Sequence, residues 1–251
     1  MPMLFQSSLL FLAALLGGMA VLVIRNPSQS TFQWVNVLSG SYLFAITVLH
    51  LLPELFAMPV SSQRIGFYIL VGFFLQLLLE LLSKGIEHGH MEAYGGHPQG
   101  VAPFTLLLAL CIHAFLDGVI LSSPHDDTLH HQHTHGAGGL LIGILFHKVP
   151  VAFALTSVLR QLVPAQRTVI GYLLLFAVAS PLGLWASHYC SQQSVLSGEG
   201  WVALWSIATG SFLHIATTIF FEASPSHQPD VRKFVGSLAG ASVAIVFELL
   251  L

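Results

Sequence analysis

A histidine and an aspartate four residues apart, His113 and Asp117, lie in the middle of a long apolar run of this sequence. Residues at this spacing share one face of an α-helix, one turn apart. A carboxylate inside a membrane is energetically costly, so it should face a polar cavity and have a partner. A neutral imidazole beside a carboxylate is a ligand pair that divalent transition metals bind. The alternative is a buried His–Asp contact that only holds this helix to its neighbour.

A second apolar run carries His147, Lys148 and Pro150. The proline removes a backbone hydrogen bond, so we expect a freed carbonyl upstream or a kink in the helix. We therefore predict one cation site in which His113, Asp117 and His147 are the ligands, with further positions left for water or a fourth ligand. Lys148 should point about 100° around the helix from His147. It would be either a counter-ion for Asp117 or a fixed charge where a second cation might otherwise bind.

The elements that position these residues must be membrane helices. The 251 residues are 55% hydrophobic and only 8% charged, whereas a soluble domain carries roughly 25% charged residues. Lipid must therefore be the solvent for most of the chain. We predict an all-α integral membrane protein with one polytopic domain over residues 1–251. The two cysteines form no CxxC motif, so we expect neither a disulfide framework nor a thiolate metal cluster.

Eight apolar runs are each near the ~20 residues that a helix needs to cross a bilayer. The first lacks a basic leader segment and a cleavage site, so we interpret it as a span rather than a signal peptide. The second should end near Pro53. His-bearing loops are expected at about 84–102 and 123–137. The expected spans are about 4–24, 32–52, 65–82, 103–122, 138–162, 168–188, 201–221 and 233–251.

Basic residues near the ends of these spans predict the orientation. Arg64 lies alone in the loop between the second and third spans. Six basic residues lie at the first, third, fifth and seventh loops: Arg25, Lys84, Arg160, Arg167, Arg232 and Lys233. The excess marks cytoplasmic loops, which places loop 84–102 inside, loop 123–137 outside and both termini outside. Nothing in the sequence indicates which membrane holds the protein.

A weak internal repeat links residues 40–47 with residues 210–217, since both begin with Gly-Ser-aromatic-Leu. It predicts two three-helix flanking repeats around a central pair formed by the fourth and fifth spans. Many transporters are built in this way, with the site near the midplane. The match could also arise in unrelated helices that pack closely through small residues.

Taken together, these motifs resemble the ZIP (Zrt/Irt-like) family of divalent metal transporters. The family's His-x-x-x-Asp/Glu-Gly pattern is matched by His113, Asp117 and Gly118, and its His-x-x-Pro pattern by His147 and Pro150. Residues 147–155 are most similar to the subgroup with Lys after this histidine. Residues 177–183 and 210–217 are also similar, with His214 where tyrosine is commoner.

Some family members bind two metals side by side, and this chain departs from them. It has Ala114, Lys148 and Ser180 where those relatives have polar or acidic residues, and Val151 replaces a further ligand. The resemblance therefore implies a single-metal site held by His113, Asp117 and His147.

Several other residues are candidates for the ion's pathway. His50 and Glu54 are again four residues apart, near the outer end of the second span, where the alternative is a helix cap. His214 is a candidate because intramembrane ionisable groups are usually functional. Glu222 lies one residue before the acid of the family pattern, and Glu80 could simply reach the interface.

The two His-rich loops are candidates for peripheral metal binding without defined geometry, or for solvated loops with adventitious affinity. The candidate residues there are His88 and His90 (with His97 nearby) in the inner loop, and His125, Asp126, Asp127, His130, His131, His133 and His135 in the outer loop.

We therefore expect a transporter, not an enzyme, that moves zinc or a similar divalent cation by alternating access. The resemblance implies transport toward the cytoplasm and an elevator-like motion in which one bundle slides against the other. Ligand chemistry also allows Fe²⁺, Mn²⁺ or Co²⁺. We expect no cofactor and no nucleic-acid partner. The lipid bilayer is a partner, and the protein could also form a homodimer. Two alternatives are a zinc-dependent intramembrane hydrolase and a membrane metal sensor.

Overall fold

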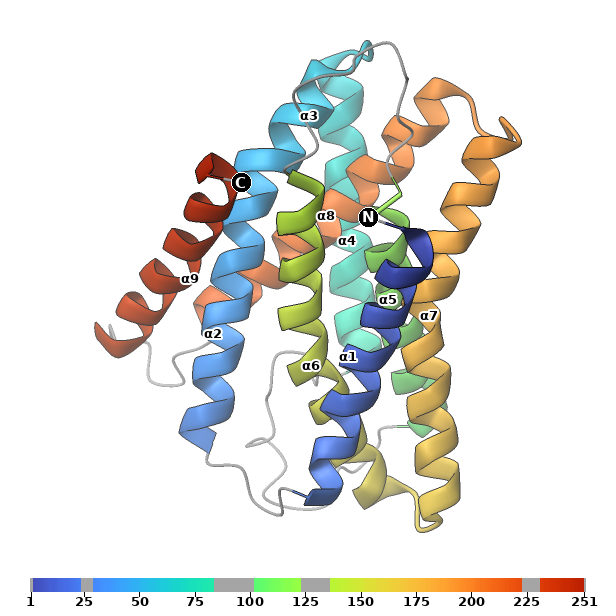
Figure 1. The fold of residues 1–251 in the computed structure, drawn as a ribbon, viewed down its shortest axis with the longest axis vertical. Helices are drawn as coiled ribbons and strands as arrows, with labels where there is room; N and C mark the ends of the chain where they lie inside the picture. The colour runs from blue at the N-terminus through green and yellow to red at the C-terminus, as the bar shows by residue number, and fades with distance from the viewer. Residues whose placement is uncertain (1, 24–28, 84–101, 123–135, 223–230, 251) are drawn as a thin grey trace.

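Helices make up all the regular structure in the part of the chain that the computed structural model describes, residues 2–23, 29–83, 102–122, 136–222 and 231–250. Six described segments are long and apolar enough to cross a membrane, and a seventh, shorter apolar helix accompanies them. The predicted all-α membrane class is confirmed. Figure 1 shows the helices as one upright bundle in which α1 begins and α9 ends at the same end.

The helix bounds agree with the predicted spans to within a few residues, apart from the end of the second span. The elements are α1 (Met3–Val23), α2 (Gln29–Ile46), a π-helical turn η1 (Thr47–Leu51), α3 (Leu52–Ala57), α4 (Ser62–Ser83), α5 (Pro103–Val119), α6 (Gly136–Leu162), α7 (Gln166–Gln192), α8 (Gly198–Glu222) and α9 (Val231–Leu250).

The expectation that the second span ends near Pro53 is wrong, because the helix continues through η1 and α3 to Ala57. The π turn widens the hydrogen-bond ring, so the Leu52 N–H donates to the Thr47 carbonyl five residues back. Pro53 then falls in the first turn of α3, where the missing N–H of a proline is tolerated. His50 lies within this turn, and π turns in helices are frequent at functional positions.

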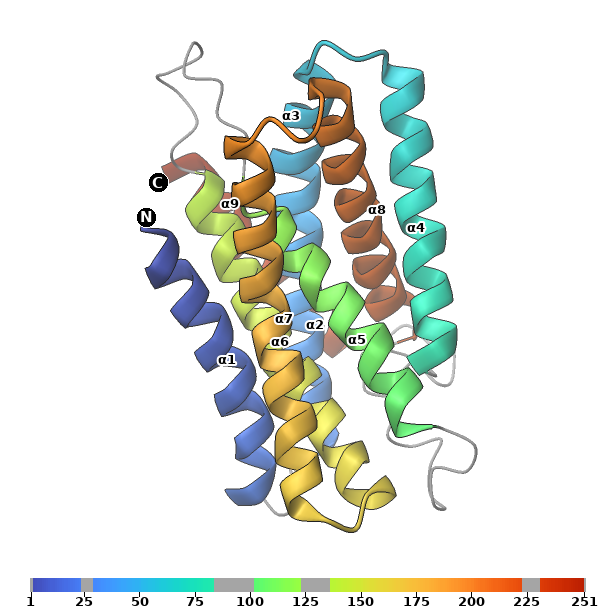
Figure 2. The ribbon, with the colours of Figure 1, turned by 90° about the vertical axis from the view of Figure 1, so that its right-hand side faces the viewer.

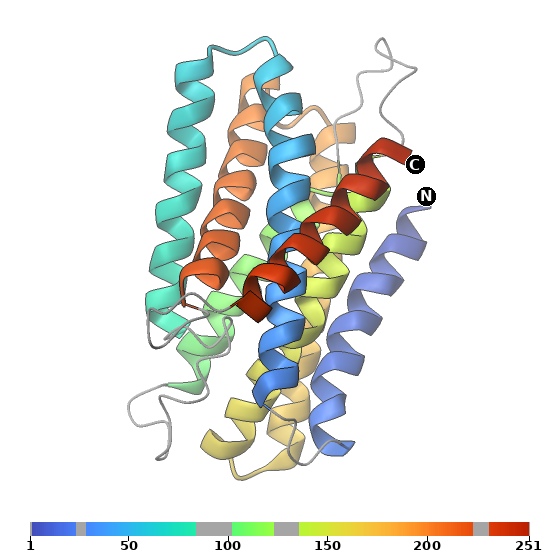
Figure 3. The ribbon, with the colours of Figure 1, turned by 90° about the vertical axis from the view of Figure 1, so that its left-hand side faces the viewer.

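The helices pack as two groups. In Figure 2, α1 and α7 lie on the opposite side of the bundle from α4 and α8. One group contains α1, α5, α6 and α7; the other contains α2, α4, α8 and α9, with α9 crossing α2 obliquely in Figure 3. The tightest pairs are α1–α6 and α5–α7 in the first group, and α2–α9 and α4–α8 in the second. Exchanging α1 with α7, α2 with α8, α4 with α9 and α5 with α6 maps each pair onto the other pair of its group, which supports the predicted repeat.

Glycines bring α5 and α7 into backbone contact. A Cβ atom added at Gly118 would collide with the carbonyl oxygen of Ser180, and one added at Gly183 would collide with that of Phe115. The two helices can approach this closely only because neither glycine has a side chain. Asp117 is therefore carried on a helix whose position against α7 is tightly fixed.

Candidate metal site

His113 and Asp117 lie on one face of α5, as their spacing predicted, and solvent hardly reaches either, at 1% and 2% exposed. The Nε2 atom of His113 is 3.6 Å from the Oδ1 atom of Asp117. This distance is too long for a hydrogen bond. Both groups therefore remain open to another partner between them.

His147 brings a second imidazole to this place from α6. It is 3% exposed, and its ring centre is 5.8 Å from that of His113, with the two rings nearly perpendicular at 84°. Zn–N bonds of about 2.0–2.1 Å would place two imidazole centres roughly 5–6 Å apart around one tetrahedral ion. The observed separation is thus close to what a shared ion requires.

The nitrogen atoms of both histidines have no hydrogen-bond partner among the described residues, and neither does Oδ1 of Asp117. Buried polar atoms are nearly always hydrogen-bonded, so such a cluster needs a polar occupant to account for it. A cation bound by lone pairs would satisfy one nitrogen of each ring and the free carboxylate oxygen together.

Lys148, also on α6, is 1% exposed and compensates the charge of Asp117. Its Nζ atom lies 3.6 Å from Oδ2 of Asp117 and donates a hydrogen bond to the Ser180 hydroxyl. Ser180 in turn donates to the carbonyl of Ala114, with 2.5 Å between the oxygens. The ammonium also lies 5.0 Å from the ring centre of Phe176, within cation–π range. Of the two roles predicted for Lys148, the structure shows the counter-ion.

The predicted ligands are neighbours in this conformation but do not form a finished cage. Among the described residues, no group of three or more His, Cys, Asp or Glu side chains is close enough to hold a metal ion. The carboxylate of Asp117 instead lies between His113 and Lys148, with one oxygen 3.6 Å from each of them. A bound ion would therefore require side-chain rotation at this cluster.

His50 contacts two carboxylates near one end of the bundle. Its Nε2 atom is 3.5 Å from Glu54, and its Nδ1 atom is 3.3 Å from Glu248 on α9. Glu54 was a candidate from its spacing, whereas Glu248 was missed. Glu248 is an ionisable residue inside the last predicted span, and such residues are usually functional. That position alone could have identified it as a candidate.

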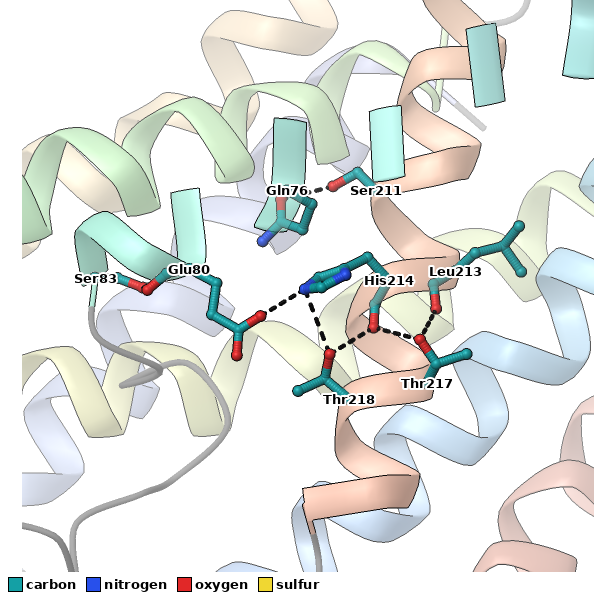
Figure 4. A network of polar contacts seen from close by, with 8 residues as sticks. All are labelled: Gln76, Glu80, Ser83, Ser211, Leu213, His214, Thr217 and Thr218. Carbon is teal, nitrogen blue, oxygen red and sulfur yellow. Dashed lines mark hydrogen bonds and ion pairs between the residues drawn. The ribbon is translucent and has the colours of Figure 1, made fainter. Parts of the chain in front are cut away.

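His214 and Glu80 form a direct contact between α8 and α4, with 2.5 Å between Nε2 and Oε2 (Figure 4). His214 was predicted as a pathway residue and Glu80 as an interfacial one, but their pairing was not foreseen. Glu222 is the last residue of α8, and its side chain lies outside the described part of the chain. Ser180, noted in the sequence only as a departure from two-metal relatives, binds Lys148.

The proposed peripheral ligands cannot be placed, since they fall in segments outside the described residues. These are His88, His90, His97, His125, Asp126, Asp127, His130, His131, His133 and His135.

Comparisons with known proteins point to one family. Residues 87–248 match the family model described as ZIP Zinc transporter. Zinc transporter ZIP9-A of Xenopus laevis is 28% identical over 183 residues, which are 68% of this chain and 58% of that protein. Zinc transporter ZIP9 of Micropogonias undulatus is 28% identical over 160 residues, 61% of this chain and 49% of that protein. The chain thus spans only about half the length of these relatives.

Proposed function

The chain belongs to the ZIP zinc transporter family and is an integral membrane protein; on that premise we propose that it carries zinc across the membrane through a single site formed by His113, Asp117 and His147. The observation that supports this most is the buried cluster in which the nitrogens of both imidazoles lack hydrogen-bond partners among the described residues. Zinc binds imidazole nitrogen and carboxylate oxygen readily. Ligand type alone leaves Fe²⁺, Mn²⁺ and Co²⁺ as competing substrates.

Lys148 explains why one ion, rather than two, would occupy this cluster. Asp117 carries one negative charge, and the ammonium 3.6 Å away carries one positive charge. One divalent ion would already leave the buried cluster with excess positive charge. A second would add more without bringing a further carboxylate, which low-dielectric surroundings disfavour.

Release of the ion follows from the same charges. Lys148 competes with the metal for the carboxylate of Asp117. The carboxylate therefore binds the ion more weakly than it would without the ammonium. Two imidazoles and a shared carboxylate make a weaker site than a closed structural one, which suits an ion that must leave again. We infer that return of the ammonium to Asp117 accompanies release.

Movement of the ion would use the two helix groups. The proposed ligands all lie in the group of α1, α5, α6 and α7, whereas the other group lies beside it and carries none of them. A sliding of the first group against the second would expose the cluster to one side of the membrane and then the other. By its resemblance to the family, net transport would be toward the cytoplasm.

An intramembrane hydrolase is a poorer account of this cluster. Metal-assisted hydrolysis needs a carboxylate or other base free to take a proton from the bound water. Among the described residues, the carboxylate next to the two histidines is that of Asp117, and it is already paired with Lys148. The ZIP family is one of transporters, which agrees with the prediction that the chain is not an enzyme.

Uptake of radioactive zinc into proteoliposomes tests the proposal. We expect the unaltered chain to transport zinc and His147→Ala to reduce the initial rate about tenfold or more, since a metal ligand is lost. His188→Ala is the matched control, because this histidine lies on α7 and its Nε2 atom contacts the exposed side chain of Gln192. The proposal fails if the unaltered chain gives no zinc flux, or if His147→Ala and His188→Ala transport equally well.

A further inference from the structure

We propose that His214 is a second cation ligand, which binds a passing divalent ion through its Nδ1 atom between α4 and α8, and that Glu80 is the positioning residue that orients its ring. This inference rests on the proposed function, since it adds a second stop to the ion's path. It concerns the helix group that does not contain the central cluster.

The contacts of His214 determine which of its nitrogens is available. Nε2 lies 2.5 Å from Oε2 of Glu80 and 3.4 Å from the hydroxyl oxygen of Thr218 (Figure 4). A carboxylate is an acceptor, so the proton of a neutral imidazole resides on Nε2. The lone pair of a neutral His214 is therefore on Nδ1.

That lone pair is buried and unused among the described residues. His214 is 5% exposed, and its Nδ1 atom has no hydrogen-bond partner there. The imidazole ring also packs against the ring of Phe73 in an edge-to-face arrangement, with 4.7 Å between the ring centres and 87° between the planes. An imidazole that donates one N–H to a carboxylate and offers the other nitrogen is the usual arrangement of a metal-binding histidine.

Holding α4 to α8 does not require this pair. The two backbones already meet at Gly72, against the carbonyl of Ile207, and at Gly210, against the carbonyl of Ile69. Ser211 also donates a 2.8 Å hydrogen bond to Oε1 of Gln76, one turn along the same interface (Figure 4). A purely structural polar contact is thus already present beside the His–Glu pair.

The His214–Glu80 contact has a counterpart in the other helix pair of its group. Glu80 lies one turn before the end of α4, at the end of this helix that is far from α3. The His50–Glu248 contact of 3.3 Å joins the π turn η1, which continues α2, to α9. The pair α2–α9 corresponds to α8–α4 in the repeat. Each repeat-related helix pair therefore carries one His–Glu contact, with the central cluster on the other helix group.

A substitution can keep the hydrogen bond made by Nε2 of His214 while it removes the lone pair of Nδ1. His214→Gln can place an amide N–H where Nε2 donates to Glu80, but it has no acceptor at the Nδ1 position. We expect this variant to keep a thermal unfolding midpoint close to that of the unaltered chain while zinc uptake into proteoliposomes falls about tenfold. Ser211→Ala, which removes the neighbouring interhelix hydrogen bond, should leave uptake unchanged. Uptake by His214→Gln at the unaltered rate would overturn the proposal.

A second measurement judges the site without relying on transport or on His214→Gln folding. His214→Cys should bind Cd²⁺ with a thiolate charge-transfer band at about tenfold lower cadmium than Ser211→Cys, its control one turn away. In the chain that keeps His214, Glu80→Gln should raise KM for zinc uptake more than it lowers the maximal rate, because it releases the ring without removing Nδ1. Equal cadmium affinity of the two cysteine variants would refute the second site, even if zinc transport itself were established; absence of transport in the unaltered chain would refute only the proposed function.

Discussion

The ammonium of Lys148 lies 3.6 Å from the carboxylate of Asp117, in a place from which solvent is almost completely excluded. The pair joins α6 to α5, and Ser180 on α7 completes the contact by accepting a hydrogen bond from Lys148. Buried ion pairs are strongly sensitive to loss of one partner, because the other charge is then left uncompensated. The stability of the metal-free protein should therefore depend on this pair more than that of the metal-bound protein.

Lys148→Met tests that dependence. Without the ammonium, Asp117 is a buried and unpaired carboxylate, and we expect the free energy of unfolding to fall by about 3 kcal/mol. Zinc should restore part of this loss, since the ion supplies the missing positive charge. Thermal unfolding with and without zinc measures both effects, and zinc should raise the midpoint of Lys148→Met more than that of the unaltered chain. An equal rise in both proteins would contradict the account.

Gly118→Ala tests the close approach of α5 to α7. The added methyl group would collide with the Ser180 carbonyl, and only movement of a backbone could relieve the contact. We expect a loss of about 1–3 kcal/mol and reduced zinc uptake, because Asp117 moves with α5. Gly171→Ala is the control, as a Cβ there meets nothing within 4 Å. Similar unfolding midpoints for the two variants would show that the helices are less tightly packed than described.

His50→Ala tests a role in admitting the ion. If the imidazole between Glu54 and Glu248 passes metal toward the central cluster, its removal should raise KM for zinc about tenfold and change the maximal rate less. Initial rates over a range of zinc concentrations separate these two constants. A variant with unchanged KM would limit His50 to a structural role at the π turn.

Replacing the five histidines of the outer loop with alanine tests the peripheral binding predicted there. The variant changes His125, His130, His131, His133 and His135. If the loop concentrates cations near the bundle, uptake at low zinc should fall about twofold or more. Uptake at saturating zinc should stay unchanged. If the saturated rate collapsed as well, the loop would belong to the transport machinery itself.

Sequence reasoning succeeded where one helix carries the whole signal. The run length predicted the spans, and the four-residue spacing predicted that His113 and Asp117 share a face of α5. Lys148 lies on another helix, and it could be proposed as a partner for Asp117 only because so few charges lie inside the predicted spans. These inferences need only helix geometry and the cost of charge in lipid.

Contacts between helices distant in the sequence were beyond the same reasoning. Nothing in the spacing of Glu80 or Glu248 indicates which histidine each one meets, because the partner lies on another helix whose rotation and depth the sequence leaves open. The π turn that carries His50 was also missed. Pro53 predicted a helix end. In the structure the helix continues past it, because one hydrogen bond spans five residues instead of four.

The most direct test of the central claim is the position of zinc in crystals of the protein, located by anomalous scattering at the zinc edge. We expect one peak between α5 and α6, about 2.0–2.2 Å from a nitrogen of His113, a nitrogen of His147 and an oxygen of Asp117. Lys148 should then have moved away from that carboxylate. Two zinc peaks at this cluster, or a transport-competent protein whose bundle binds zinc elsewhere and not there, would contradict it.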